Sequence, residues 1–164
     1  MKFVSIIMGS KSDYGVMQEC AKTLEKFGVA YELIIASAGR SPERTHEYVK
    51  AAQNKGAQIF IAASGMAAHL ASTITAYTTR PVLGVPMDSG PLRGEDALLS
   101  TVMMPSGMPV GTLAIGKAGA VNAAYLAVQI MALNDDELRV KLDEDRIAKA
   151  KKVELDSSEI EVIL

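Results

Sequence analysis

The sequence has 164 residues, of which 49% are apolar and 22% charged, the size and hydrophobicity of one compact domain. With a net charge of −2 and a pI near 5.7, the protein has no strong positive field that would attract nucleic acid or an anionic membrane. We therefore expect a small-molecule partner. A single cysteine, no apolar run of membrane-spanning length and no basic-then-apolar leader predict a cytoplasmic protein without disulfides.

Short apolar segments recur along the chain, and each is followed by Gly, Ser or Pro. This pattern is typical of strands that are buried on both faces of a parallel sheet. The predicted strands are Phe3–Met8, Tyr31–Ala36, Gln58–Ala62, Pro81–Val85 and Val110–Ile115.

Segments with helical spacing alternate with these strands. The predicted helices are Asp13–Phe27, Pro42–Asn54, Ala67–Ala76 and Gly119–Leu133. We expect Ser12 or Asp13 to cap the first helix, Pro42 to begin the second, and Gly28 and Gly56 to end them. The alternation predicts an α/β fold, a three-layer α/β/α sandwich with a doubly wound parallel sheet of about five strands.

The last third of the chain holds two unusual helical segments. Residues 119–127 are small and apolar almost all round, which indicates a helix buried in the core or, as we favour, against another subunit. Residues 135–157 are charged with a thin apolar stripe, which predicts a long C-terminal helix lying on a neighbour, followed by a short tail at 159–164. We therefore expect a single domain, 1–164, with its core in 1–133 and the C-terminal helix and tail in 134–164.

Ligands of open parallel sheets bind beyond the carboxyl ends of the strands, where loops and helix N-termini converge. This rule confines the search for a site to five loops. They are residues 9–13, 37–41, 63–69, 86–96 and 103–109.

The first two loops each lead from a strand into a helix, so their N–H groups and the helix dipole favour a phosphate. Arg40 in the second loop can bind a phosphate through two parallel hydrogen bonds, and the alternative is a solvated surface charge. Asp13 could accept hydrogen bonds from ribose hydroxyls, or it could only cap a helix. A plain helix cap explains the first loop as well as a phosphate does.

The third loop brings small residues to another helix start, which would let a planar ligand lie against the backbone at Ser64, Gly65, Met66 and Ala67. His69 is a weak catalytic candidate, because a histidine in an apolar helix is more often a hydrogen-bonded core residue. His46 lies on a polar face and is expected to be solvated. No His or Cys is grouped with carboxylates, so no metal site is expected.

Taken together, these loops resemble the class I 5-(carboxyamino)imidazole ribonucleotide mutases, the PurE proteins of bacterial purine synthesis. The resemblance is spread in order over most of the chain up to about Leu133. It rests on residues 8–13, on Ser37-Ala38 with Arg40 and Pro42, on Gly65 with residues 67–70, and on residues 81–86, 104–107 and 109–119.

This resemblance implies a flavodoxin-like fold, a homo-octamer with active sites shared between subunits, and no metal or organic cofactor. It implies that a ribonucleotide binds with its phosphate on Ser10, Ser37 and Arg40 and its ribose on Asp13. The loop from Gly65 to His69 would shelter the imidazole and the carboxylate that migrates from the exocyclic nitrogen to a ring carbon.

One departure from the family pattern concerns the chemistry directly. Family members carry a proton-shuttling histidine where this chain has Gly39, and glycine has nothing to titrate. Further departures gather near the expected pocket, at Ser64, Pro91 and Met103 among others. We therefore expect an impaired mutase, or alternatively a natural or engineered scaffold whose remodelled site binds a ligand without the native reaction. A flavodoxin or receiver domain is a weaker alternative, since the first strand lacks an acidic cluster.

Overall fold

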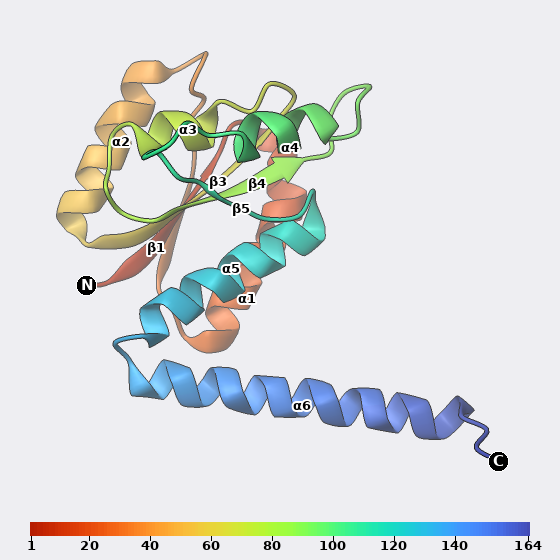
Figure 1. Ribbon diagram of the computed structural model, residues 1–164. Coiled ribbons are helices and arrows are strands. Elements are labelled where there is room, and N and C mark those ends of the chain that lie inside the picture. The colour runs from red at the N-terminus through yellow and green to blue at the C-terminus, as the bar shows by residue number, and fades with distance from the viewer.

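The computed structural model describes all residues from 1 to 164 and shows an α/β/α sandwich around one parallel sheet (Figure 1). The sheet has five strands in the order β2-β1-β3-β4-β5. The strands are β1 (Phe3–Met8), β2 (Tyr31–Ile35), β3 (Ala57–Gly65), β4 (Val82–Met87) and β5 (Gly111–Thr112). The predicted fold class is confirmed.

The two faces of the sheet are covered by different helices (Figure 1). On one face lie α1 (Tyr14–Phe27) and α5 (Lys117–Ala132), and on the other lie α2 (Pro42–Lys55), α3 (Leu70–Thr75) and α4 (Glu95–Val102). Alternate residues of β1 point to opposite faces: Ile6 is buried against α1 and α5, and Ile7 against α2 and α3. The continuous apolar composition of β1 reflects this burial on both sides.

The small residues of α5 face the core of their own chain. Ala120, Ala123, Ala124 and Ala127 are all buried in the cluster that packs against α1 and the sheet. Gly119 is also buried, and a Cβ on it would lie 1.6 Å from the carbonyl oxygen of Ala114. Small side chains let the two helices approach closely, so packing within the chain accounts for this composition. A subunit interface, which we favoured from the sequence, is therefore not required to explain the small residues at these positions.

Cys20 is buried in the same cluster, as predicted. Burial raises the pKa of its thiol to about 12, so the reactive thiolate is scarce at neutral pH.

The C-terminal helix α6 (Asp136–Ile160) is longer than predicted and runs without a break. Its first turns lie on α5 and α1, where Leu138 is buried, and its second half extends beyond the rest of the molecule (Figure 1). Asp135 begins the helix, because its carboxylate accepts a hydrogen bond from the Leu138 amide at 3.1 Å. No helix of the chain has the length and apolarity needed to cross a membrane.

Two predicted boundaries were wrong, and one helix was missed. The fifth strand shortens to two residues, and the third helix begins at Leu70, because the Ala68 amide donates to Ser100 Oγ instead of entering the helix. Helix α4 was not predicted, since Gly90, Pro91 and Gly94 gave its start the appearance of a loop. Gly94 begins α4 in a left-handed conformation with φ of 88° and makes no side-chain cap.

Asp13 stands at the N-cap position of α1, as one of the two predicted candidates, but its side chain makes no capping hydrogen bond there. Ser10 caps a short 3-10 turn, η1 (Lys11–Asp13), which leads into α1. Its hydroxyl accepts from the Ser12 amide at 3.4 Å, while the Asp13 carboxylate accepts from the Ser10 amide at 3.2 Å. The predicted positions of Pro42, Gly28 and Gly56 at helix ends are confirmed.

Candidate functional site

A pocket of about 470 Å³ opens at the carboxyl edge of the sheet. It lies where the strand order reverses, between β1 and β3, which is where the crevice of a doubly wound sheet forms. Four strand ends contribute: residues 9–13 follow β1, residues 37–40 follow β2, residues 64–70 end β3 and begin α3, and Ser89 follows β4.

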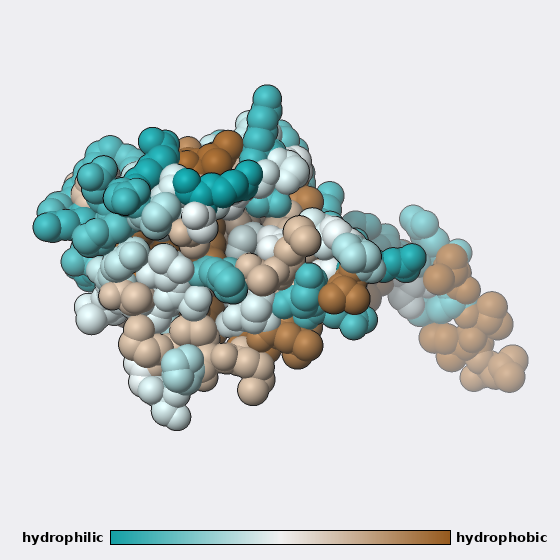
Figure 2. Space-filling model, turned by 90° about the horizontal axis from the view of Figure 1, so that it is seen from above, coloured by the Kyte–Doolittle hydropathy of each residue, from teal (hydrophilic) through white to brown (hydrophobic).

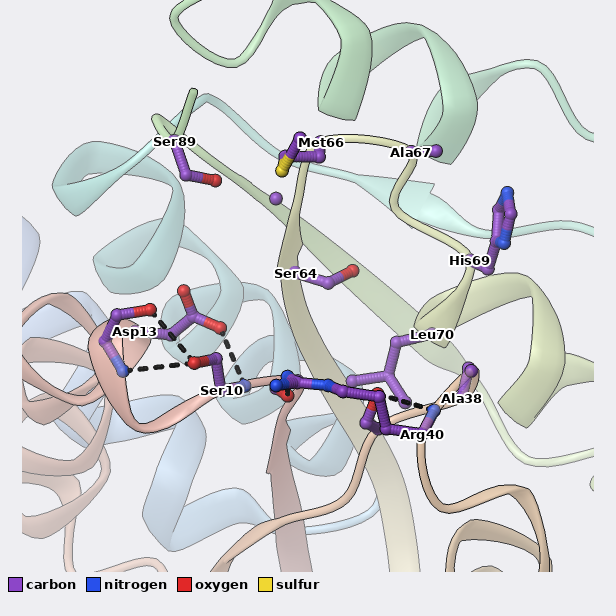
Figure 3. Close-up of a pocket in the computed structure, with 15 residues that line it drawn as sticks. Ser10, Asp13, Ala38, Arg40, Ser64, Met66, Ala67, His69, Leu70 and Ser89 are labelled. Carbon is purple, nitrogen blue, oxygen red and sulfur yellow. Dashed lines mark hydrogen bonds between the residues drawn. The ribbon is translucent and has the colours of Figure 1, made fainter. Parts of the chain in front are cut away.

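All the site residues expected from the sequence line this one pocket (Figure 3). They are Ser10, Asp13, Ser37, Gly39, Arg40, Ser64, Gly65, Met66, Ala67 and His69. The last of the five candidate loops, residues 103–109, contributes nothing to the pocket, and Met103 is 77% exposed.

Arg40 joins the first two loops. Its Nη2 donates to the carbonyl oxygen of Gly9 at 2.9 Å, and both its backbone N–H and its Nε approach Ser37 Oγ, at 3.1 and 3.4 Å (Figure 3). The side chain is exposed to solvent and is also fixed in place, so it is not a freely moving surface charge. The guanidinium and the Ser10 and Ser37 hydroxyls therefore lie together at one end of the pocket.

Asp13 is the most buried polar group of the pocket, with 5% of its surface exposed. Burial raises the pKa of its carboxyl group, and the Ser10 amide and the Arg40 charge lower it by a smaller amount. Only one of its oxygens receives a hydrogen bond from the chain, on Oδ2. The other oxygen is available to accept from a ligand hydroxyl.

Gly39 marks an open part of the wall. A Cβ built on this residue would meet no atom within 4 Å, and its backbone lies outside the left-handed region that disfavours other residues. A side chain could therefore be placed at this position without moving its neighbours.

Gly65 has the opposite environment. A Cβ there would lie 1.7 Å from Ser89 Oγ and 3.0 Å from Ser89 Cβ, so only glycine allows the Ser89 side chain its observed position. The next residue, Met66, has a positive φ of 56° and is 56% exposed. Positive φ is uncommon in a non-glycine residue, and such strained residues gather at ligand sites.

Of the two histidines, His69 differs from its expected environment and His46 does not. His69 is exposed at the rim of the pocket, where it begins α3, so the expectation of a core histidine was wrong. Its imidazole makes no hydrogen bond within the chain, because its position before the first turn keeps it out of the core. His46 is exposed as predicted, with its ring 4.4 Å from the ring of Tyr77.

Sequence reasoning missed Ser89. It lies in the loop after β4, which the strand-end rule had included, but the sequence of that loop gave no reason to select it from its neighbours. Its place beside Gly65 depends on the pairing of β3 with β4, in which Gly65 lies opposite Met87.

Comparison with known proteins shows to which family the chain belongs. The sequence profile described as AIR carboxylase matches residues 3–152. The chain belongs to the AIR carboxylase family. No group of three or more His, Cys, Asp or Glu side chains in this member could hold a metal ion.

Relatives of this AIR carboxylase family member cover nearly its whole length. It is 50% identical over 150 residues to the N5-carboxyaminoimidazole ribonucleotide mutase of Brucella melitensis, with 92% of this chain and 93% of that protein covered. It is 47% identical over 156 residues to the mutase of the same name from Bacillus subtilis, with 95% and 96% covered. A crystal structure of Treponema denticola PurE, 26% identical, superposes with a TM-score of 0.85 over 99% of this chain and 100% of that one.

Proposed function

We propose that the chain is an N5-carboxyaminoimidazole ribonucleotide mutase of purine biosynthesis whose activity is impaired at one position. The observation that carries the binding part of this proposal is the convergence of the two strand-to-helix loops on one pocket, joined by Arg40. The names of relatives at about 50% identity support the reaction class.

The substrate phosphate binds to Ser10, Ser37 and Arg40 in this proposal. Two hydroxyls and a guanidinium, added to the N-terminal ends of η1 and α2, supply donors suited to a phosphate. Asp13 receives a ribose hydroxyl on its free oxygen, and the heterocycle lies against the segment from Ser64 to Ala67. These roles require no metal or organic cofactor.

The reaction moves a carboxylate. The bond from the exocyclic nitrogen to the carboxylate breaks, the nitrogen takes up a proton, and carbon dioxide is held in the pocket. A new bond then forms from a ring carbon to the carbon dioxide, and that carbon loses its proton. A histidine at position 39 would move the protons in the family pattern. Gly39 cannot, and the other titratable side chains lining the pocket are Asp13, Arg40 and the rim residue His69. His69 or water then carries the protons at a lower rate.

Replacing Gly39 with histidine tests this proposal. The open space at Gly39 accommodates the new side chain, so we expect Gly39→His to raise the mutase rate about 10²- to 10⁴-fold, the usual contribution of a general acid or base. An absorbance assay on carboxyaminoimidazole ribonucleotide measures the rate. Gly15→His is the matched control, because Gly15 is exposed on α1 and also has no atom within 4 Å of a built Cβ.

The same observation favours a second candidate function. A pocket that keeps its phosphate cradle but has no titratable group at position 39 suits a scaffold that binds a nucleotide-like ligand without the mutase reaction. Calorimetric binding of aminoimidazole ribonucleotide, with no turnover in either the wild type or Gly39→His, would support the scaffold and contradict the impaired mutase. Absence of binding would contradict both.

A further inference from the structure

Two hydroxyl groups of the pocket have no partner within the chain. The hydroxyls of Ser10, Ser12 and Ser37 all take part in hydrogen bonds with neighbouring residues. By contrast, Ser64 Oγ and Ser89 Oγ make no hydrogen bond, although both residues line the pocket and are half-buried. In Figure 3 both hydroxyls are directed into the hollow between the strand ends.

The two serines are held in place by the backbone around them. Ser64 lies in β3, where it pairs with Pro86 of β4, and a Cβ built on Gly9 would lie 3.4 Å from Ser64 Cβ. Ser89 Oγ lies directly over Gly65, and the Ser89 amide donates to the Met87 carbonyl at 3.0 Å. Both hydroxyls are therefore on the β3 and β4 side of the pocket.

The phosphate cradle is on the other side. Arg40 follows β2, and its guanidinium reaches the Gly9 carbonyl at the end of β1. In the order β2-β1-β3-β4, Ser64 of β3 is one strand spacing from β1, and Ser89, after β4, is two spacings away, about 10 Å at the usual spacing. One small group cannot contact both Arg40 and Ser89. A ligand whose phosphate lies at Arg40 extends its other end toward Ser64 and Ser89.

We propose that Ser64 and Ser89 form a hydroxyl pair that recognises the heterocycle of the bound nucleotide. A hydroxyl both donates and accepts, so the pair fits a ring that carries an amino donor beside ring-nitrogen or carboxylate acceptors. Because the two hydroxyls have no competing partner in the chain, such a ligand gains hydrogen bonds without breaking any. This inference rests on the proposed function, since it takes the phosphate to lie at Arg40.

Two probes that differ only in the heterocycle test the hydroxyl pair. Aminoimidazole ribonucleotide carries it, and ribose 5-phosphate lacks it. We expect Ser64→Ala and Ser89→Ala each to weaken aminoimidazole ribonucleotide binding about 2- to 10-fold, the loss of one net hydrogen bond, and to leave ribose 5-phosphate binding unchanged. Isothermal titration calorimetry measures both. Arg40→Ala, in contrast, should weaken both probes.

Ser106→Ala is the matched control, because Ser106 is exposed, lies outside the pocket and also makes no hydrogen bond within the chain. It should leave both affinities unchanged. Suppose that the wild type binds both probes. If each serine variant then loses the same affinity for the two probes, or loses none, the hydroxyl pair is overturned and the proposed function stands. Failure of the wild type to bind either probe would overturn both.

Discussion

At the scale of single residues, the pocket contains a carboxyl group, that of Asp13, whose charged form is disfavoured by burial. Asp13 is nearly buried, and burial raises the pKa of its carboxyl group despite the nearby Arg40. A carboxyl group whose pKa is raised by folding stabilises the protein at low pH, and this contribution is lost as the pH rises through its folded pKa. At neutral pH the charged form of Asp13 therefore opposes folding, which suits a residue kept for its ligand.

Asp13→Asn tests this conflict between stability and binding. Asparagine can still accept the hydrogen bond from the Ser10 amide, so we expect the free energy of unfolding at pH 7 to stay equal or rise. The loss of a charged acceptor should weaken aminoimidazole ribonucleotide binding about 10-fold or more. Urea unfolding and calorimetry measure the two quantities. Asp143→Asn, at an exposed position on α6, should change neither, and a clear loss of stability in Asp13→Asn would contradict the argument.

The residues of the site could be predicted largely because topology determines them. Parallel strands bring their carboxyl ends to one edge, so loops as distant in sequence as Ser10 and Ser64 had to meet. The sequence could not predict which residues each side chain contacts or how far it is exposed. The exposure of His69, the hydrogen bond of Arg40 to Gly9 and the place of Ser89 over Gly65 depend on packing between elements, which no local pattern reports.

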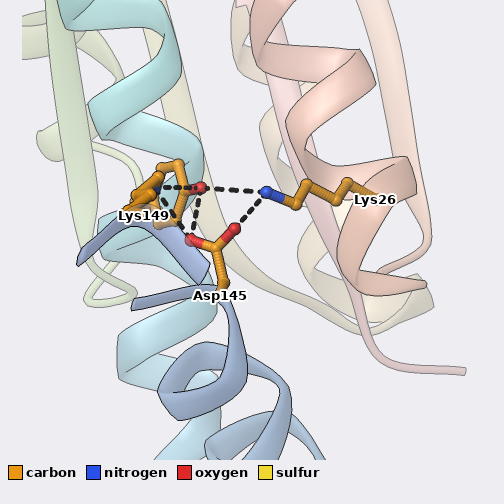
Figure 4. Close-up of polar contacts among 4 residues, drawn as sticks. Lys26, Asp145 and Lys149 are labelled. Atoms are coloured by element: carbon orange, nitrogen blue, oxygen red, sulfur yellow. Dashed lines mark hydrogen bonds and ion pairs between the residues drawn. The ribbon is translucent and has the colours of Figure 1, made fainter. Parts of the chain in front are cut away.

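At the scale of elements, α6 is held to the sandwich by a small charged network (Figure 4). Asp145 receives hydrogen bonds from Lys149 and Tyr125, each at 2.8 Å, and from Lys26 of α1. Burial alone would raise the pKa of Asp145, but the hydrogen bonds from Lys149, Lys26 and Tyr125 together hold it well below its usual range. The network thus joins α6 to both α1 and α5.

Asp145→Asn should destabilise the protein at pH 7 by about 1–2 kcal/mol, a value between that of an exposed ion pair and that of a well-formed charged hydrogen bond. Because folding lowers the pKa of Asp145, its contribution is complete above the unfolded pKa near 4 and is lost as the pH falls through the folded pKa. Urea unfolding of both proteins at pH 7 and at pH 3 measures this. The difference should shrink at pH 3, and a difference that grows there would contradict the assignment.

The elements were predictable where periodicity was strong and uncertain where it was not. The apolar spacing of β1 and α1 gave them almost to the residue. Helix α4 has only eight residues and follows two glycines and a proline, so its helical pattern was too short to outweigh the loop signals. Strand β5 is two residues long, and its pairing with Leu83 and Gly84 of β4 shows only in three dimensions.

At the scale of the whole molecule, the protruding part of α6 carries several exposed apolar side chains among its charged ones. Ile147, Val153, Leu155 and Ile160 are each more than half exposed, and Figure 2 shows apolar side chains gathered on the protruding end. A protruding helix end that carries exposed apolar side chains is suited to contact with other chains. The number of chains is a prediction from the resemblance to the mutases, which implies a homo-octamer.

Light scattering coupled to size-exclusion chromatography tests this assembly. We expect a mass close to eight times the 17.4 kDa of one chain. Ile147→Glu should lower that mass, because a buried charge without a partner is costly at an interface, whereas Lys151→Glu, already exposed and charged, should not. A monomer at micromolar concentration would contradict the proposal.

The hydrogen bond from Arg40 to the Gly9 carbonyl has a consequence for how a phosphate arrives. The loops 9–13 and 37–41 are already joined by this hydrogen bond before a ligand binds. An incoming ligand therefore has little backbone to order, and the entropy cost of ordering these loops falls on folding and not on binding. The pocket is in this sense preorganised, and the backbones of residues 9–13 and 37–41 have little reason to differ between the free and the occupied protein.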